Sequence, residues 1–220
     1  MLSQQDLPRV WMGPDLPGVR RAPRQHGTYF DFAYASLPAM PSHLETEWGW
    51  LKTLPRAANP LDAGADTTVL DRFEEAGIAL PPELLAFYAD RDLHAHVDSI
   101  TGCWTDFGAF DIGGGEWLVL FLRDSQDVLF WLVHMHRAGG HRVLVCGPDD
   151  LGAWYDEGLE GDRVGRLPPS QTDFNVCAGS YREFVYRFAV ENALWTSLTA
   201  KPQRALTALE RDYLARHPSP

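Results

Sequence analysis

Two pairs of histidines, each with one residue between its members, are the first candidates for chemistry in this sequence. They are His94 with His96 and His134 with His136. Alternate residues of a β-strand share a face, so His134 and His136 could present two imidazoles together. A catalytic zinc site needs a third protein ligand and an open coordination position, which a third histidine or Asp98 could supply only if the fold brings it close. We predict instead that these histidines lie at solvated strand ends and bind no metal.

Carboxylate pairs and cysteines offer little further chemistry. Asp124 and Asp127 flank a turn, where aspartate is favoured because it forms local hydrogen bonds, and two-carboxylate glycoside hydrolysis would need a sugar cleft around them. Cys103, Cys146 and Cys177 form no CxxC pair and border apolar sequence, so we predict buried, inert thiols. Neither a nucleophile elbow nor a phosphate-binding loop occurs. We therefore predict no catalytic residues and no cofactor.

Acidic residues are concentrated in the centre of the chain. The formal charge is −11 overall, and residues 61–174 hold 7 basic and 21 acidic side chains, which gives 7 − 21 = −14. Such a surface repels nucleic acids and anionic lipids and attracts basic proteins. Residues 147–178 read as an acidic loop whose aromatic residues could anchor a partner or pack on the core. The candidate partner-binding residues there are Asp149, Asp150, Trp154, Tyr155, Asp156, Glu157, Glu160 and Asp162.

Four helices are expected in the chain. Their predicted starts are Thr68, Pro82, Ser180 and Pro202, and the last helix is expected to reach about Arg216. Thr68 has capping-box spacing with Asp71, as Ser180 has with Glu183. Gly77 suits the end of the first helix, because glycine accepts the left-handed conformation there.

Strand-like segments fill the centre of the chain. They cover residues 28–34, 103–110, 117–122, 128–136 and 142–146. Short turns join the consecutive central strands, which predicts an antiparallel meander. Because strands and helices are segregated along the chain, we predict an α+β fold with a central, mostly antiparallel sheet flanked by helices. Residues 1–26 show no periodicity and no signal-peptide pattern, so we expect an irregular leader.

Four segments, taken in order, resemble the SUKH superfamily of Smi/Knr-type proteins. The Gly-x-x-Leu-Pro element at 77–84 leads into a helix, and a glycine turn at 113–117 opens a hairpin. An aspartate turn at 124–127 precedes the strand that holds Trp131, and a Ser-Tyr-Arg-Glu-Phe helix start follows at 180–184. The similarity divides the chain into an N-terminal extension packed on the domain (1–65), a SUKH-like domain (66–195) and a C-terminal helix (196–220).

The resemblance implies a protein that binds another protein and has no catalytic residues. Bacterial SUKH members are immunity proteins that neutralise a cognate toxin, and fungal members regulate cell-wall assembly. We therefore predict a cytoplasmic, non-catalytic protein-binding module, most specifically an immunity protein with a basic, nuclease-like toxin as its partner. Binding to nucleic acid is not expected, because the centre is acidic and lacks basic residues interleaved with aromatics. No membrane span is expected, because the longest apolar runs are too short to cross a bilayer. A metal-dependent hydrolase using His134 and His136, and a general adaptor or scaffold subunit, remain alternatives.

Overall fold

Consecutive apolar strands joined by tight turns build the central sheet of this chain. The computed structural model describes residues 6–20, 24–26, 28–61, 67–148, 151, 164–166 and 174–217. Its six-stranded sheet has the order β8-β4-β5-β6-β7-β9. The strands are β4 (Gly108–Asp111), β5 (Trp117–Arg123), β6 (Phe130–Met135), β7 (His141–Cys146), β8 (Val164–Arg166) and β9 (Asn175–Ala178). Only β4 and β8 pair in parallel, so the predicted α+β fold with a mostly antiparallel sheet is confirmed.

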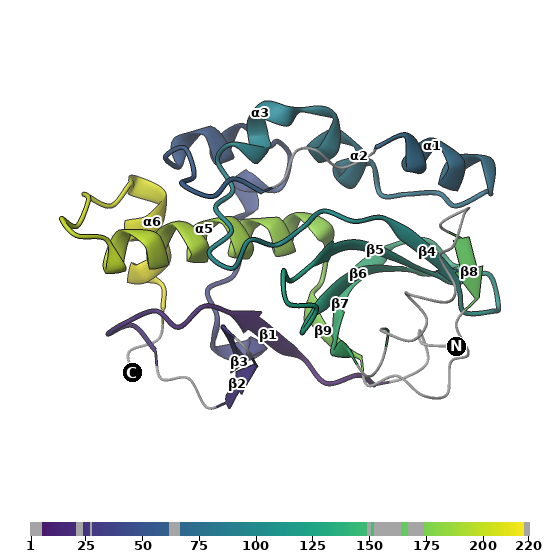
Figure 1. Ribbon diagram of the computed structural model, residues 1–220, viewed down its shortest axis with the longest axis horizontal. Helices are drawn as coiled ribbons and strands as arrows, with labels where there is room; N and C mark the ends of the chain where they lie inside the picture. The colour runs from purple at the N-terminus through teal and green to yellow at the C-terminus, as the bar shows by residue number, and fades with distance from the viewer. Residues whose placement is uncertain are drawn as a thin grey trace.

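Five helices of the described residues lie on one side of this sheet (Figure 1). They are α1 (Thr68–Glu75), α2 (Pro82–Ala89), α3 (Arg91–His94), α5 (Tyr181–Thr199) and α6 (Ala208–Ala215). Short 3₁₀ turns at Tyr34–Ser36, Ser42–Leu44 and Gly49–Thr53 precede them. The long helix α5 runs across the molecule between α1–α3 and a small N-terminal sheet, and it contacts both sheets. It is therefore the element around which the other parts assemble.

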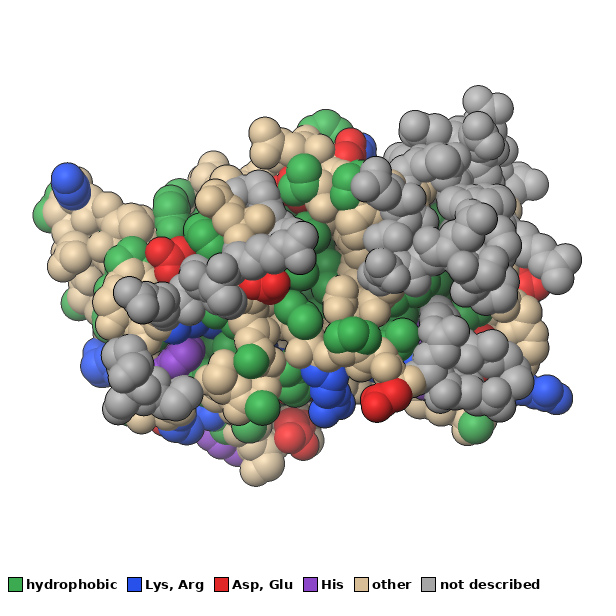
Figure 2. All heavy atoms as spheres, turned by 90° about the horizontal axis from the view of Figure 1, so that it is seen from below, with side chains coloured by type: hydrophobic (Ala, Val, Ile, Leu, Met, Phe, Trp, Pro, Cys, Tyr) green, Lys and Arg blue, Asp and Glu red, His purple; other side chains and the backbone are tan. Residues whose placement is uncertain are grey.

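Apolar side chains fill both faces of the central sheet, because β5, β6 and β7 are apolar at almost every position. Trp131 and Val133 of β6 face α5, where the Trp131 and Phe184 rings lie 6.2 Å apart. Leu118 of β5 and Leu132 of β6 face the opposite way, in a second cluster. Figure 2 shows the molecule from the side of the small sheet, where hydrophobic side chains lie among scattered charges of both signs.

The predicted irregular leader contains two strands that the sequence analysis missed. β1 (Val10–Gly13) and β2 (Arg24–His26) flank β3 (Tyr29–Ala33) in a three-stranded antiparallel sheet. These strands are too short to show an alternating pattern, which is why the prediction was wrong here. Trp11 of β1 is fully buried, and its ring packs edge-on against Phe184 of α5 at 5.8 Å.

One buried carboxylate connects the N-terminal residues, α5 and α6. Glu191 of α5 has no exposed surface. It accepts hydrogen bonds from the Trp11 indole at 2.7 Å, from two Arg20 nitrogens at 2.7 Å each, and from the Tyr213 hydroxyl. A side chain at Gly13 would collide with this group, since its Cβ would lie 2.5 Å from a Glu191 oxygen. The hydrogen bonds that Glu191 accepts therefore require glycine at position 13.

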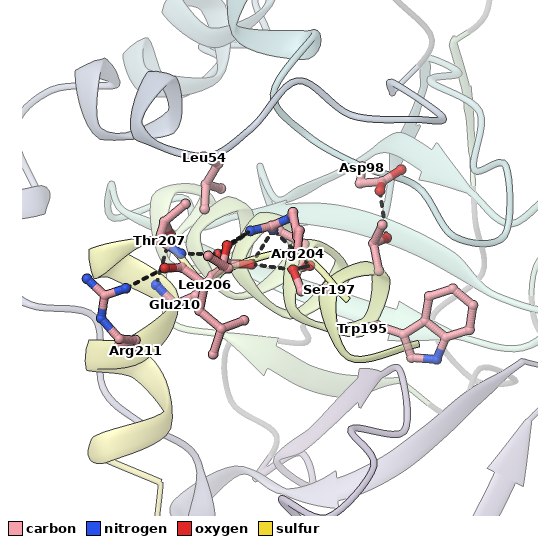
Figure 3. Close-up of polar contacts among 12 residues, drawn as sticks. Leu54, Asp98, Trp195, Ser197, Arg204, Leu206, Thr207, Glu210 and Arg211 are labelled. Carbon is pink, nitrogen blue, oxygen red and sulfur yellow. Dashed lines mark hydrogen bonds and ion pairs between the residues drawn. The ribbon is translucent and has the colours of Figure 1, made fainter. Parts of the chain in front are cut away.

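The last helix starts later than predicted. α6 begins at Ala208, six residues after Pro202, because Thr207 and Glu210 form a capping box that fixes its first turn. Figure 3 shows Glu210 turned toward Arg204 and Ser197, with contacts of 2.5 and 2.9 Å. Burial opposes the ionisation of Glu210, but hydrogen bonds from Arg204 and Thr207 lower its pKa below the ordinary value. Glu210 therefore joins α6 to the end of α5.

Four other local predictions need correction. Only residues 108–110 of the predicted strand at 103–110 belong to β4, and β8 and β9 lie inside the segment predicted as a loop. α1 begins at Thr68 as expected, but no side chain caps it. Ser180 does cap α5 by accepting the Glu183 N–H at 3.1 Å, whereas the Glu183 carboxylate binds the N–H of Gly179 rather than that of Ser180.

Candidate functional site

Trp104 is the most exposed large hydrophobic side chain in the described part of the chain. Its exposed fraction is 50%, compared with 41% for Leu85. Two main-chain hydrogen bonds with Arg123, of 2.8 and 2.9 Å, hold it in an isolated β-bridge. The main chain of Trp104 is thus fixed while its indole faces solvent. Such tryptophans commonly supply much of the binding energy of protein interfaces.

Charged side chains hold the surroundings of Trp104 in place. The Arg123 guanidinium carbon lies 4.7 Å from the centre of the indole, which is a cation–π distance. Arg123 is itself held by Asp106 at 3.2 Å and by Asp127 at 2.5 Å. The side chain of Asp127 is 49% exposed. We call Trp104, Asp106, Arg123 and Asp127 the tryptophan platform; its formal charge is +1 − 2 = −1.

The turn beneath the platform is tightly hydrogen-bonded. Asp124 accepts from the Gln126 N–H through its side chain at 3.1 Å and from the Asp127 N–H through its carbonyl at 2.9 Å. The predicted local hydrogen bonding of Asp124 is therefore confirmed. Asp127 has a φ of +55°, a conformation that aspartate tolerates better than most residues. Ser125 donates to the carbonyl of Thr101 at 2.5 Å and ties the turn to the loop that carries Trp104.

His134 lies inside the sheet and not at a solvated strand end, so that prediction was wrong for this residue. It has no exposed surface. Arg142 donates to its Nδ1 at 3.2 Å, and its Nε2 lies 3.2 Å from a Glu116 oxygen. Since arginine only donates, Nδ1 accepts and Nε2 carries the proton. Burial lowers the pKa of His134 to about 4, and His136 contributes to the shift, so this ring is neutral at pH 7.

The geometry of His134 argues against the metal-dependent hydrolase. The rings of His134 and His136 share one side of β6, as expected, with centroids 4.4 Å apart. Both nitrogens of His134 are engaged, however, and no lone pair is left for a metal ion. Within the described ranges, no three histidine, cysteine, aspartate or glutamate side chains are arranged to hold one.

The other predicted histidine pair and the cysteines have structural roles. His94 is buried, with Nε2 3.1 Å from the carbonyl of Phe87, and His96 Nδ1 lies 2.8 Å from the carbonyl of Leu54. Neither lies at the end of a strand. The three cysteines are buried, as predicted, and form no disulfide with one another. Burial raises the pKa of the Cys103 and Cys177 thiols, which makes both poor nucleophiles.

A cavity of about 550 Å³ opens between the loop before α2 and the end of the central sheet. We call it the loop cavity; its walls include Leu80, Pro81, Trp117, His136, Arg137 and His141. Three segments meet here: the leucine–proline element, the glycine turn with Trp117, and the end of the histidine strand with the turn that follows it. The fold thus assembles one concave surface from segments that are distant in sequence.

A second cavity of about 530 Å³ lies beyond the contact between Glu83 and His141. The Glu83 oxygen is 2.9 Å from His141 Nε2, and this hydrogen bond lowers the pKa of Glu83. Glu45, Glu183 and Arg182 line the second cavity. The Arg182 guanidinium also stacks over the ring of Trp48 at 4.1 Å from its centre. Most charged groups around this cavity are therefore already engaged within the protein.

The acidic residues predicted to bind a partner lie outside the described residues. This applies to Asp149, Asp150, Trp154, Tyr155, Asp156, Glu157, Glu160 and Asp162. The tryptophan platform, by contrast, was missed. The sequence analysis placed Trp104 inside a predicted strand, where an apolar side chain is expected to be buried. In the structure β4 starts only at Gly108, so Trp104 lies outside it. No sequence pattern marks such an exposed position.

Comparison with known proteins found no match among family models, curated proteins or solved structures. None of the helices in the described ranges is both long and apolar enough to cross a bilayer. The candidate sites are therefore defined by the residues and contacts of this chain.

Proposed function

We propose that this chain is a non-catalytic, cytoplasmic protein-binding module, and specifically an immunity protein that neutralises a basic, nuclease-like toxin. The observation that carries the proposal is the tryptophan platform, where the exposed Trp104 and the half-exposed carboxylate of Asp127 both contact Arg123. An aromatic anchor next to a negative charge suits a partner surface that presents lysine or arginine.

The distribution of charge supports a basic partner. Residues 61–174, which include the platform, carry a formal charge of −14. A negative surface of this kind accelerates encounter with a basic protein and can cover the phosphate-binding surface of a nuclease. In this proposal the acidic residues at 149–162 supply a second contact region, with Trp154 and Tyr155 as further anchors. The resemblance to SUKH immunity proteins points to the same class of partner.

The state of the reactive side chains supports a non-catalytic role. The Cys103 and Cys177 thiols have raised pKa values, and His134 is held between Glu116 and Arg142. A general base must be able to reach a substrate proton, which full burial prevents for His134. A general adaptor would use the same surface without neutralising a toxin, and only a biological assay separates the two.

The first prediction concerns affinity for the partner. We would capture the partner from the native cells at low and moderate salt, identify it, and measure its dissociation constant. Trp104→Ala should weaken binding by about 2 kcal/mol or more, as expected for the loss of an aromatic hot spot. Asp127→Asn keeps the shape and the backbone conformation but removes the charge, so it should mainly slow association and reduce its dependence on salt.

Leu85→Ala is the matched control, since Leu85 is the other exposed large hydrophobic residue in the described part of the chain. If Trp104→Ala and Leu85→Ala had the same small effect, the platform would not be the contact surface. Expression of the captured partner in a bacterial host, with and without this chain, distinguishes the two forms of the proposal. Growth restored by the wild type and not by Trp104→Ala supports immunity, whereas a partner that does not harm the host supports an adaptor.

A further inference from the structure

The loop cavity differs in charge from the rest of this acidic protein. Among the described residues, the charged or titratable side chains in its walls are Arg137, His136 and His141, and all three are basic. Two carboxylates close by in the fold are paired with histidines: Glu83 contacts the wall residue His141 at 2.9 Å, and Glu116 contacts His134 at 3.2 Å. A basic recess on a chain with a net charge of −11 indicates a ligand of opposite charge.

Arg137 is the main candidate to receive such a ligand. Within the described residues its guanidinium makes no hydrogen bond or ion pair, although its side chain lines the cavity. The stem of Arg137 packs over Gly115, whose φ of +78° and missing side chain leave room for it; a Cβ there would lie 3.4 Å from Arg137 Cγ. Arginine suits carboxylate and phosphate groups because it can donate two parallel hydrogen bonds.

His136 and His141 add hydrogen-bonding capacity beside Arg137. The ring nitrogens of His136 have no hydrogen-bond partner among the described residues. Burial lowers the pKa of His136, and the charge of Arg142 has the same effect, so this ring is neutral and can still donate at pH 7. His141 Nε2 lies 2.9 Å from a Glu83 oxygen and 3.1 Å from the Tyr181 nitrogen, so this ring nitrogen is occupied within the protein and only Nδ1 can face a ligand.

The remaining walls are apolar. Leu80, Pro81 and Met135 are buried residues that border the cavity, and half-buried Trp117 supplies an aromatic surface. The volume of about 550 Å³ falls within the range of small-molecule sites, which combine apolar walls with a few polar groups.

We propose that the loop cavity binds a small organic anion, with Arg137 and His136 holding its carboxylate or phosphate and with Trp117 and Leu80 covering its apolar body. This site is separate from the tryptophan platform and does not depend on the proposed immunity function. The partner and the anion would contact different residues, and each can be tested without the other.

Two aryl anions, benzoate and phenyl phosphate, serve as probes, with benzamide as the neutral analogue. Their dissociation constants are measured by titration of the whole chain with NMR detection, at pH 7. We expect one or both anions to bind more tightly than benzamide, and the one that does identifies carboxylate or phosphate as the preferred group. Arg137→Gln should weaken anion binding about tenfold, because a charge-assisted hydrogen bond is lost.

Arg91→Gln is the control, since Arg91 is also exposed but lies on α3 and not in the cavity walls. His136→Gln tests the second donor and should weaken anion binding by a smaller factor. Two outcomes overturn the proposal: anions that bind no better than benzamide, or anion binding that Arg137→Gln leaves unchanged. The anion titrations do not involve the protein partner. A negative result in them therefore leaves the immunity proposal unaffected, and a negative partner-capture result leaves the anion proposal unaffected.

Discussion

His134 shows how the burial of a single polar side chain affects stability. In the folded protein its pKa is about 4, whereas the ordinary value of 6.5 applies in the unfolded chain. Between these values the unfolded state binds more protons than the folded state. The free energy of unfolding must therefore decrease as the pH falls from about 6.5 to about 4.

The second prediction follows from this difference. Between pH 7.5 and pH 5, the contribution of His134 should reduce the free energy of unfolding by about 2 kcal/mol. His134→Gln removes the titrating group and should flatten the pH dependence by this amount, although it lowers stability at pH 7.5 itself. Urea unfolding at both pH values measures the effect, and His43→Gln, at an exposed residue, is the control. An unchanged slope in His134→Gln would show that other groups cause the acid sensitivity.

At the level of single residues, the sequence revealed chemical type but not environment. The shared side of His134 and His136 follows from the two-residue period of a strand. The burial of His134 does not, because it depends on the second cluster covering the far face of the sheet. Trp104 shows the opposite error, since a tryptophan among apolar neighbours suggests burial and only the position of β4 leaves it exposed.

At the level of elements, glycine and capping residues set helix ends in a way that can be measured. Gly77 follows α1 with a φ of +78°, and a Cβ added there would meet no atom within 4 Å. The third prediction is that Gly77→Ala lowers the free energy of unfolding by about 1–2 kcal/mol through backbone strain alone. Gly49 also has open space around it but a negative φ. If Gly49→Ala cost as much in urea unfolding, the conformation of Gly77 would not be the cause.

The fourth prediction concerns the capping box of α6. Thr207→Ala should lower the free energy of unfolding by about 1 kcal/mol, because the Glu210 N–H loses its acceptor. Ser36→Ala removes a hydroxyl from an exposed turn and should have less than half this effect. Equal effects of the two substitutions would mean that the box contributes little to holding α6 on α5.

Most elements were predictable where the local signal and the packing agree. The strands near β5, β6 and β7 and the helices from Thr68, Pro82 and Ser180 follow from apolar runs, proline and capping spacing. β1 and β9 were missed because they are stabilised by pairing with distant segments, as in the bridge between Arg9 and Val176. The loop cavity could not be predicted for the same reason, since three separate segments form it.

At the level of the whole molecule, Glu191 joins residues near both ends of the described chain through Trp11, Arg20 and Tyr213. The fifth prediction is that Glu191→Gln lowers the free energy of unfolding by about 3–5 kcal/mol, because Arg20 is left buried without its counter-charge. The loss should appear in urea unfolding as a shift of one transition. Glu75→Gln, at an exposed position on α1, should change stability by less than about 0.5 kcal/mol. A loss below 1 kcal/mol for Glu191→Gln would show that the ion pair is replaced by water.

The position of Glu191 also decides how the partner-binding region can be mapped. Serial deletion from either end is a common way to locate such a region. Here, removal of the first twenty residues would take away Trp11 and Arg20, and removal of the last ten would take away Tyr213. Either shortened protein would lose binding because it misfolds, and the lost segment would be mistaken for the contact surface. Mapping must therefore rely on single substitutions of exposed residues, with no residues removed from either end.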